Sequence, residues 1–301
     1  MRNLLDRIKG GEVLICDGAM GTMLMTEGLK AGECPERINI ENPKILESIA
    51  RRYFEAGADI IEANTFGGSP LKLAQYSLED DTEKINKIAV EAVRRIVGSK
   101  AYVAASCGPC GRILKPYGDT DPEEIFLGFK RQIQALIDAG IDMICVETMT
   151  DLAEATLAIK AVKSVSPSTP VAVTMTFDLT PNGFFTIMGN SIKEAAAGLD
   201  DAGADIIGSN CGNGIENMIR IAEEFKKYTS LPVLIQSNAG LPELEDGQIV
   251  YPETPEFMAE GCKKLLEIGV GIIGGCCGTT PEHITAFATA VNDFSNSQID
   301  S

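Results

Sequence analysis

The amino-acid sequence predicts a single (β/α)8 TIM barrel that spans residues 1–301. Short apolar runs recur along the chain, stretches of helical periodicity separate them, and one short turn motif repeats ahead of alternate runs. Eight such units in a chain of 301 residues are typical of this barrel, whose functional groups gather at the C-terminal ends of its strands.

The eight apolar runs have the composition of fully buried strands. Their hydrophobicity is continuous rather than alternating, as strands covered on both faces require, and each run ends in small or polar residues. The predicted strands lie within residues 13–19, 58–66, 101–109, 141–149, 170–177, 204–212, 231–240 and 270–278. The clearest helical periodicity covers residues 43–56, 82–97, 123–139 and 256–268.

A weak internal repeat marks the turns that enter alternate strands. Ala56-Gly57-Ala58-Asp59-Ile60-Ile61 recurs with small changes at residues 139–144 and 202–207, and residues 268–273 echo it. Glycine suits the C-terminus of a helix because a left-handed backbone costs it little, so the repeat predicts a helix end followed by a strand. An open doubly wound sheet would need G-x-G-x-x-G after its first strand, and Asp17-Gly18-Ala19-Met20-Gly21 lacks that spacing.

Composition and charge limit the class of partner. The chain has 26 basic and 43 acidic residues, a net charge of −17, which disfavours nucleic acids and anionic membrane surfaces. No apolar run approaches the roughly 18 residues that cross a bilayer, and no export signal is recognisable, so we expect a cytoplasmic protein. Nine cysteines in such a chain favour metal binding, catalysis or burial over a disulfide framework. The oligomeric state stays open.

Three cysteines follow predicted strands and form the candidate metal site. Cys276 and Cys277 stand side by side in Gly274-Gly275-Cys276-Cys277-Gly278, and Cys211 ends the sixth run. Neighbouring residues of a regular strand point to opposite faces, so the flanking glycines must break the strand for both sulfurs to reach one ion. Three thiolates suit Zn²⁺ and leave a fourth position open, as in catalytic zinc sites.

Polar residues end most of the other runs. Asp17 and Glu147 are carboxylates that could hold an ammonium group, whereas amides and backbone N–H groups at the remaining strand ends could hold a carboxylate. Those remaining residues are Asn64, Thr65, Asn210 and Asn238. An amino acid that carries a sulfur is the ligand that fits this set.

Six motifs together resemble the homocysteine S-methyltransferase family, and the opening motif is most similar to the homocysteine-binding domain of cobalamin-dependent methionine synthase. The resemblance covers nearly the whole chain. The motifs are Asp17-Gly18-Ala19-Met20-Gly21-Thr22, Glu62-Ala63-Asn64-Thr65-Phe66-Gly67, Val146-Glu147-Thr148, Gly208-Ser209-Asn210-Cys211, Asn238-Ala239-Gly240 and Gly274-Gly275-Cys276-Cys277-Gly278-Thr279-Thr280-Pro281.

The resemblance implies a role for each site residue. It implies that Zn²⁺ is bound by three cysteines and that the homocysteine thiolate completes the tetrahedron before it attacks a methyl group. It also implies that two carboxylates bind the substrate ammonium, that a loop holds the substrate carboxylate, and that one asparagine occupies the zinc when substrate is absent. By this resemblance the zinc ligands are Cys211, Cys276 and Cys277, and the carboxylates that bind the ammonium are Asp17 and Glu147. The loop that holds the substrate carboxylate contains Asn64, Thr65 and Phe66, and the asparagine that occupies the zinc is Asn238.

The methyl donor is less well defined by the sequence. Eight βα units account for all 301 residues, so we expect no second barrel or cobalamin module, and the chain itself would not hold the donor. The opening motif favours a methyl-corrinoid carried by a separate protein. Betaine or S-methylmethionine as donor, and another small thiol as acceptor, are the alternatives.

Two other classes of function stay open. A phosphate-binding barrel enzyme could use the glycines after the seventh and eighth strands, although it would leave the cysteines unexplained. A non-catalytic zinc-binding or thiol-binding barrel would close its metal site with a fourth protein ligand.

Several other residues carry weaker predictions. We interpret Cys107-Gly108-Pro109-Cys110 as a loop at the substrate mouth rather than a redox dithiol, because no helix starts directly after it. His283, the only histidine, lies in the first turn of the last predicted helix and is expected to face solvent, with a place beside the site as the alternative. Residues 294–301 are expected to form a loose polar tail. Core burial is expected for Cys16, Cys145 and Cys262, and either gap filling or a surface for a bulky donor for Met20, Met23 and Met25.

Overall fold

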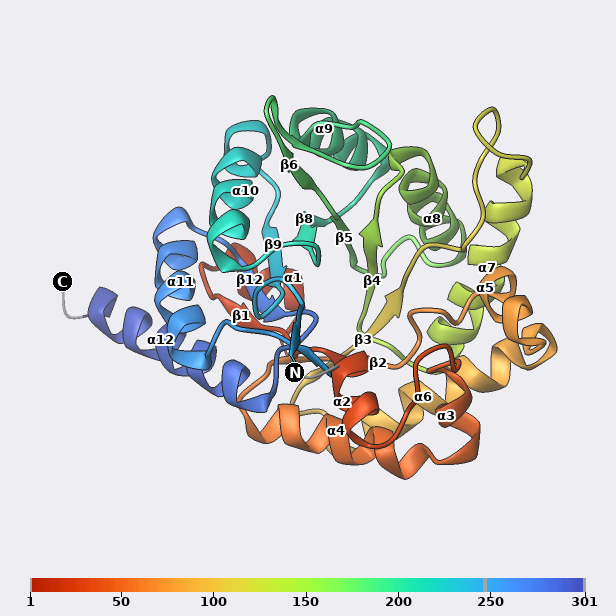
Figure 1. The fold of residues 1–301 in the computed structure, drawn as a ribbon, viewed down its shortest axis with the longest axis horizontal. Coiled ribbons are helices and arrows are strands. Elements are labelled where there is room, and N and C mark those ends of the chain that lie inside the picture. Colours follow the sequence, from red (N-terminus) through yellow and green to blue (C-terminus); the bar gives the residue numbers. More distant parts are fainter. Residues whose placement is uncertain (1, 246–247, 300–301) are drawn as a thin grey trace.

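Eight parallel strands form a closed barrel in the computed structural model, which describes residues 2–245 and 248–299 (Figure 1). The hydrogen-bonded order is β1-β12-β9-β8-β5-β4-β3-β2, and a bridge between Cys16 and Ile60 joins β1 to β2. The strands are β1 (Leu14–Ile15), β2 (Ile60–Ala63), β3 (Tyr102–Cys107), β4 (Met143–Met149), β5 (Val171–Met175), β8 (Ile206–Asn210), β9 (Val233–Ser237) and β12 (Ile272–Gly275). Each lies inside a predicted run, and the predicted TIM barrel is confirmed.

Helices surround the barrel and connect its strands. The outer ring consists of α4 (Pro43–Glu55), α6 (Thr82–Val97), α7 (Pro122–Asp138), α8 (Leu152–Val165), α9 (Ile192–Ala202), α10 (Ile215–Tyr228), α11 (Pro255–Ile268) and α12 (Pro281–Ile299). Shorter helices are α1 (Leu4–Lys9), α2 (Met20–Thr26), α3 (Arg37–Glu41) and α5 (Pro70–Leu73). The loose tail predicted from residue 294 is wrong as far as Ile299, because α12 continues to that residue; residues 300 and 301 lie outside the described part.

The internal repeat joins neighbouring strands at the N-terminal end of the barrel. In each copy the glycine has a positive φ, as expected at a helix end, and the aspartate accepts hydrogen bonds from a backbone N–H of the adjacent strand segment and from a basic side chain. The partners are Ile15 and Arg7 for Asp59, Val103 and Arg94 for Asp142, and Val171 and Lys163 for Asp205. The repeat is therefore a structural feature of the barrel.

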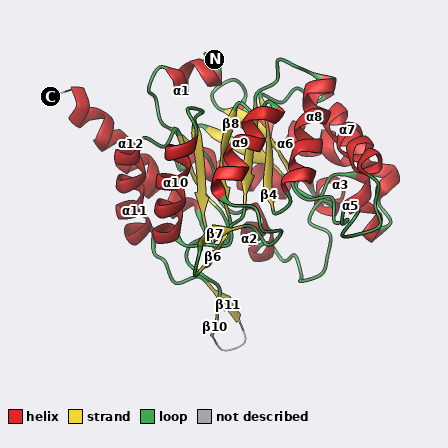
Figure 2. Cartoon of the chain, turned by 90° about the horizontal axis from the view of Figure 1, so that it is seen from above, coloured by secondary structure: helices red, strands yellow, loops and turns green. Residues whose placement is uncertain are grey.

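The two ends of the barrel differ. Leu4 and Ile8 of α1 pack into a buried cluster with inward-facing strand residues such as Leu14 and Ile272 at the N-terminal end. At the opposite end, the loops after β5 and β9 carry two hairpins, β6 (Asp178–Thr180) with β7 (Gly183–Phe185) and β10 (Glu243–Glu245) with β11 (Gln248–Val250). Figure 2 shows these hairpins and α2 at one end of the strands and α1 at the other. The C-terminal end is therefore the one built for a site.

The predicted core thiols are confirmed, because Cys16, Cys145 and Cys262 are all fully buried. Within residues 2–245 and 248–299, no helix combines the length and the apolar character needed to cross a membrane.

Candidate functional site

A cavity of about 270 Å³ opens at the C-terminal ends of the strands, and most of the predicted site residues line it. The predicted residues in its wall are Asn64, Thr65, Phe66, Glu147, Cys211, Cys276 and Cys277. Three other predicted residues, Asp17, Asn210 and Asn238, are buried close by but do not line the cavity.

The three predicted metal ligands lie together. Their Sγ atoms are all within 4.8 Å of one another, and those of Cys211 and Cys277 are 3.7 Å apart. A tetrahedral zinc site with Zn–S bonds of about 2.3 Å would place its sulfurs about 3.8 Å apart. The cluster could therefore hold a metal ion, and its donor set is the one that suits Zn²⁺.

The backbone leaves strand geometry where each cysteine must turn toward the cluster. Strand β12 ends at Gly275, and the next peptide curls so that Thr279 donates its N–H to the carbonyl of Cys276 at 3.0 Å. On the other side, Cys211 follows β8 with a φ of +60°, a left-handed conformation that is uncommon for a residue with a side chain. The predicted break of strand alternation is confirmed.

The protein stabilises a thiolate within this cluster. Hydrogen bonds from Cys211 and Cys276 lower the pKa of Cys277 to about 3. Thiolate is the form that binds metal ions, so Cys277 offers one charged ligand at neutral pH. The pKa of Cys276 is raised by its hydrogen bonds to Cys211 and Cys277, and that of Cys211 is raised to about 11, so these two thiols would lose their protons when a metal binds.

A network of buried carboxyl groups lies beside the thiols. Glu147 accepts hydrogen bonds from the Ser106 hydroxyl and, at 3.0 Å, from the amide of Asn210. Burial raises the pKa of Glu147 well above its usual range, and it raises those of Asp17 and Glu62 to about 8. A cation bound beside these carboxyl groups would favour their ionised forms and so offset the cost of burying them.

The loop after β2 presents backbone to the cavity. The side-chain amide of Asn64 donates to Asn39 at 2.7 Å and to the carbonyl of Pro35 at 2.9 Å, and the hydroxyl of Thr65 donates to the carbonyl of Ser106 at 2.7 Å. Because these side chains already have partners, the Asn64–Phe66 segment offers a ligand mainly its backbone.

Asn210 and Asn238 do not face the cavity. Asn210 is fully buried, and its Oδ1 accepts hydrogen bonds from Thr148 and Thr174, both at 2.7 Å. Thr148 has a φ of +58°, so Asn210 holds a strained turn next to Glu147. The Oδ1 atom of Asn238 is buried without a partner in the described part of the chain.

The prediction that His283 faces solvent is wrong. Its side chain is buried: Nδ1 accepts a hydrogen bond from the Thr280 N–H at 3.1 Å, and Nε2 lies 3.0 Å from the carbonyl of Glu253. His283 thus connects the start of α12 to the segment before α11. No local pattern indicates this contact, because its partner is 30 residues away.

The Cys107-Gly108-Pro109-Cys110 segment lies beside the Phe66 loop. Gly108 donates its N–H to the carbonyl of Phe66 at 2.8 Å, and a Cβ at Gly108 would approach the Phe66 ring to 2.4 Å. Burial raises the pKa of Cys110 to about 12 and that of Cys107 further, the opposite of an activated redox thiol. These contacts favour the interpretation as a loop that supports the mouth.

Sequence reasoning missed several residues of the cavity wall. Glu36, Glu62, Ser106 and Gln236 line it in addition to the predicted set. Glu62 lies within β2, two residues before the predicted strand end at Asn64. An acidic residue inside an otherwise apolar strand is the signal that could have found it.

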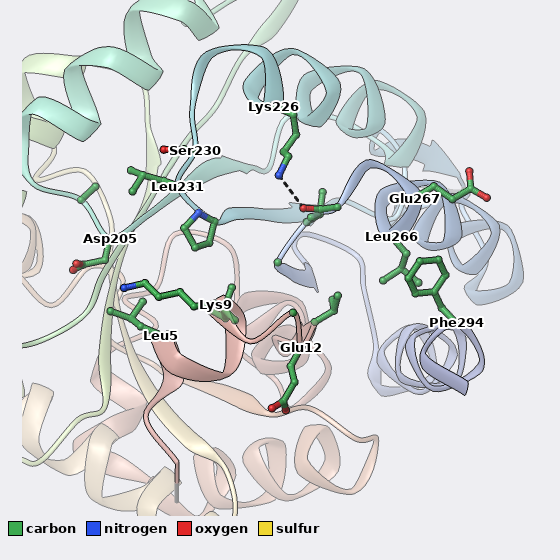
Figure 3. Close-up of a pocket in the computed structure, with 18 residues that line it drawn as sticks. Leu5, Lys9, Glu12, Asp205, Lys226, Ser230, Leu231, Leu266, Glu267 and Phe294 are labelled. Carbon is green, nitrogen blue, oxygen red and sulfur yellow. Dashed lines mark hydrogen bonds between the residues drawn. The ribbon is translucent and has the colours of Figure 1, made fainter. Parts of the chain in front are cut away.

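A larger depression lies at the opposite, N-terminal end of the barrel, beneath α1 (Figure 3). It measures about 610 Å³, and its charged side chains include Lys9, Asp205 and Lys226. Lys226 donates to the carbonyl of Gly269 at 3.2 Å, and Asp205 pairs with Lys163. The contacts of Lys226 and Asp205 stabilise the barrel itself. The smaller cavity, in contrast, is lined by thiols and carboxyl groups and lies at the C-terminal end of the strands, where the active sites of such barrels are found.

The fold and the site define a class of protein: a (β/α)8 barrel with three clustered thiols that could hold a metal ion and a carboxyl-lined cavity at the C-terminal ends of its strands. The profile of the family described as Homocysteine S-methyltransferase matches residues 14–291, and the chain belongs to this family.

Relatives and solved structures agree with this assignment. The methionine synthase of Mycobacterium leprae (strain TN) is 34% identical over 296 residues, covering 93% of this chain and 24% of that protein. The methionine synthase of Mycobacterium tuberculosis (strain ATCC 25618 / H37Rv) is also 34% identical, over 306 residues that cover 96% of this chain and 25% of that protein. The chain thus spans about a quarter of the length of these relatives.

Among solved structures, the metallated form of the homocysteine methyltransferase MmuM from Escherichia coli has the same fold. Its TM-score is 0.78 at 22% identity, with 95% of this chain and 99% of that chain covered. A methyltransferase from Methanosarcina mazei gives a TM-score of 0.64 at 13% identity, with 97% of this chain and 98% of that chain covered.

Proposed function

We propose that this chain is a zinc-dependent methyltransferase that activates the thiol of homocysteine for attack on a methyl donor, giving methionine. The observation that carries the proposal is the combination of three cysteine sulfurs and several carboxyl groups in one small cavity. No lysine, arginine or histidine lines that cavity among the described residues. Such a wall suits a metal cation together with the ammonium group of an amino acid.

The residues divide the work between binding and orientation. Cys211, Cys276 and Cys277 would hold Zn²⁺, which when bound lowers the pKa of a thiol ligand and keeps it as the nucleophilic thiolate. The carboxyl groups would bind the substrate ammonium, and the backbone of the Asn64–Phe66 loop would bind its carboxylate. Fixing both ends of the amino acid aims its sulfur toward the open mouth, where the donor must arrive in line.

For the donor we favour a methyl-corrinoid carried by a separate protein or by another part of a longer chain. Most of the large apolar side chains that are exposed in the described residues lie in segments that follow β1, β2, β3, β5 and β9, at the end of the barrel where the cavity opens. They are Met25, Phe66, Ile113, Tyr117, Leu179, Ile187, Met188, Leu241, Leu244 and Ile249. An apolar rim of this kind suits contact with another protein surface better than contact with a small polar donor. The free cysteines suit a reducing compartment, so we place the protein in the cytoplasm.

The direct test is a methyl-transfer assay on the purified chain. Homocysteine is supplied with methylcobalamin, betaine or S-methylmethionine in parallel reactions, and methionine is measured together with the bound zinc. Methionine formed from methylcobalamin supports the proposal. If more methionine is formed from betaine or S-methylmethionine, that compound and not a corrinoid is the methyl donor. Bound zinc that never yields methionine with any donor or with other small thiols would indicate a non-catalytic zinc-binding barrel.

A further inference from the structure

Glu253 contacts the loops that follow three neighbouring strands of the barrel. It lies between the β10–β11 hairpin and α11, at the C-terminal end of the strands (Figure 2). Its N–H donates to the carbonyl of Ala239, after β9, at 2.9 Å. Its Oε2 accepts from the N–H of Ile215, the first residue of α10 after β8, at 3.0 Å. Its carbonyl lies 3.0 Å from Nε2 of His283, in the first turn of α12 after β12.

Two of these three strands lead into the thiol cluster. Cys211 follows β8, whereas Cys276 and Cys277 follow β12, and β9 lies between those two strands in the barrel. The ladder hydrogen bonds of the barrel therefore do not join β8 to β12 directly. The contacts of Glu253 supply a direct link between the loops that follow them.

Glycine stands on each of the three loops where the segment around Glu253 packs. An added Cβ at Gly214 would lie 2.1 Å from Oε1 of Glu253, and one at Gly278 would lie 2.1 Å from the Tyr251 ring. An added Cβ at Gly240 would lie 3.0 Å from the proline between Tyr251 and Glu253. A side chain at any of these positions would displace part of the segment, so the sequence of all three loops leaves room for this contact.

Glu253 also supplies a missing helix cap. Helix α10 begins after Gly214, which has no side chain that could accept from the free N–H groups of the first turn. The Glu253 carboxylate accepts from one of them instead, and its negative charge is favourable at that end of a helix. The cap fixes the far end of the short turn that starts at Cys211, where φ is +60°.

We propose that Glu253 is a positioning residue of the metal site, which holds the loop of Cys211 and the loop of Cys276 and Cys277 at the separation that one zinc ion requires. This inference rests on the metal-binding part of the proposed function and adds a residue that does not line the cavity. Sulfurs that already lie within 4.8 Å of one another lose little conformational freedom when the ion binds, so the contacts of Glu253 raise the affinity for zinc.

The test is the dissociation constant of zinc from the purified chain, measured by competition with a chelating indicator. In Glu253→Ala the constant should rise by about 10- to 100-fold, the effect typical of residues that orient metal ligands. Glu253→Gln keeps a side-chain oxygen for the Ile215 N–H and should restore an affinity close to that of the unsubstituted protein.

A second variant and a matched control separate this role from general stability. Gly214→Ala, at a φ of −77° that alanine adopts without strain, displaces the Glu253 carboxylate and should also weaken zinc binding. Asp151→Ala removes a carboxylate that caps α8 by accepting from the Ala153 N–H at 2.8 Å. Asp151 lies in the loop after β4, which carries none of the three cysteines, so its loss should leave the zinc affinity unchanged. Circular dichroism at the temperature of the titration confirms that each variant is folded.

Three results would overturn the inference: unchanged zinc affinity in folded Glu253→Ala and Gly214→Ala, an equal loss in Asp151→Ala, or a loss in Glu253→Gln as large as that in Glu253→Ala. Zinc bound with the expected affinities but without methyl transfer to homocysteine would count against the proposed function and leave the role of Glu253 intact. An unsubstituted protein that binds no zinc would overturn both.

Discussion

The side-chain amide of Asn210 donates a hydrogen bond to Oε2 of Glu147 at 3.0 Å. The same nitrogen lies 3.8 Å from the sulfur of Cys276, so one buried side chain contacts both the carboxyl side and the thiol side of the cavity. Asn210 itself does not line the cavity. Its contribution is to fix the distance between the group that would bind an ammonium and the group that would bind a metal.

Asn210→Ala should therefore destabilise the protein strongly. The change leaves the buried N–H of Thr148, the hydroxyl of Thr174 and one oxygen of Glu147 without their partner, and we expect a loss of roughly 2–4 kcal/mol in the free energy of unfolding. Urea denaturation measures this loss. Asn182→Ala, at an exposed loop position, is the control and should change stability by less than about 0.5 kcal/mol. Equal effects of the two substitutions would contradict the assigned network.

The buried carboxyl groups should make stability depend on pH. Asp17 and Glu62 have pKa values of about 8 in the folded protein, above those of the unfolded chain, so folding favours their protonated forms. Their contribution to stability is fully present below about pH 4 and is lost as the pH rises toward 8.

We expect the thermal midpoint of Glu62→Gln to fall less than that of the unsubstituted protein between pH 6 and pH 9, two pH values chosen to lie about one unit or more on either side of the folded pKa. Glu282→Gln, on the surface, should behave like the unsubstituted protein. Identical pH profiles for all three proteins would show that Glu62 is not a buried acid.

Gly278 should tolerate no side chain. Its φ is +81°, and an added Cβ would lie 2.1 Å from the Tyr251 ring, directly after the two cysteines. We expect Gly278→Ala to cost roughly 3 kcal/mol of unfolding free energy and to weaken zinc binding. Gly189→Ala is the matched control, because Gly189 has a φ of +88° with no atom within 4 Å and should show only the backbone cost of about 1 kcal/mol. Zinc titration and denaturation together separate the two effects, and equal losses would argue against the Tyr251 contact.

The two thiols of the Cys107–Cys110 segment should be dispensable for the chemistry. Both are buried and lie outside the cavity wall, so Cys107→Ser/Cys110→Ser should lower stability by about 1–3 kcal/mol for the buried hydroxyls without changing zinc content or methyl transfer per folded molecule. Zinc analysis and initial rates check this. A variant that folds and binds zinc but transfers no methyl group would require a catalytic role for this pair.

The parts of the fold that could be predicted are those that depend on local pattern. Continuous apolar runs mark the eight strands because the barrel buries both faces of each one, and the glycines of the repeat mark helix ends because only they adopt a left-handed backbone freely. The cysteine cluster could be predicted for a similar reason, since the glycines around Cys276 and Cys277 allow the turn that brings both sulfurs to one side.

The parts that could not be predicted depend on contacts between distant segments. Glu62 stands out as an acidic residue among apolar strand neighbours, but the groups that it faces in the cavity lie on other strands and loops. Asn210 is turned away from the cavity by its bonds to Thr148 and Thr174, and His283 is buried by the carbonyl of Glu253. Side-chain direction at these positions follows from packing rather than from local sequence.

X-ray absorption at the zinc edge, with and without homocysteine, tests the central claim most directly. We expect three sulfur neighbours at about 2.3 Å in the zinc-loaded protein and a fourth sulfur at about the same distance after homocysteine is added. An unchanged number of sulfur neighbours in the presence of bound homocysteine would contradict it.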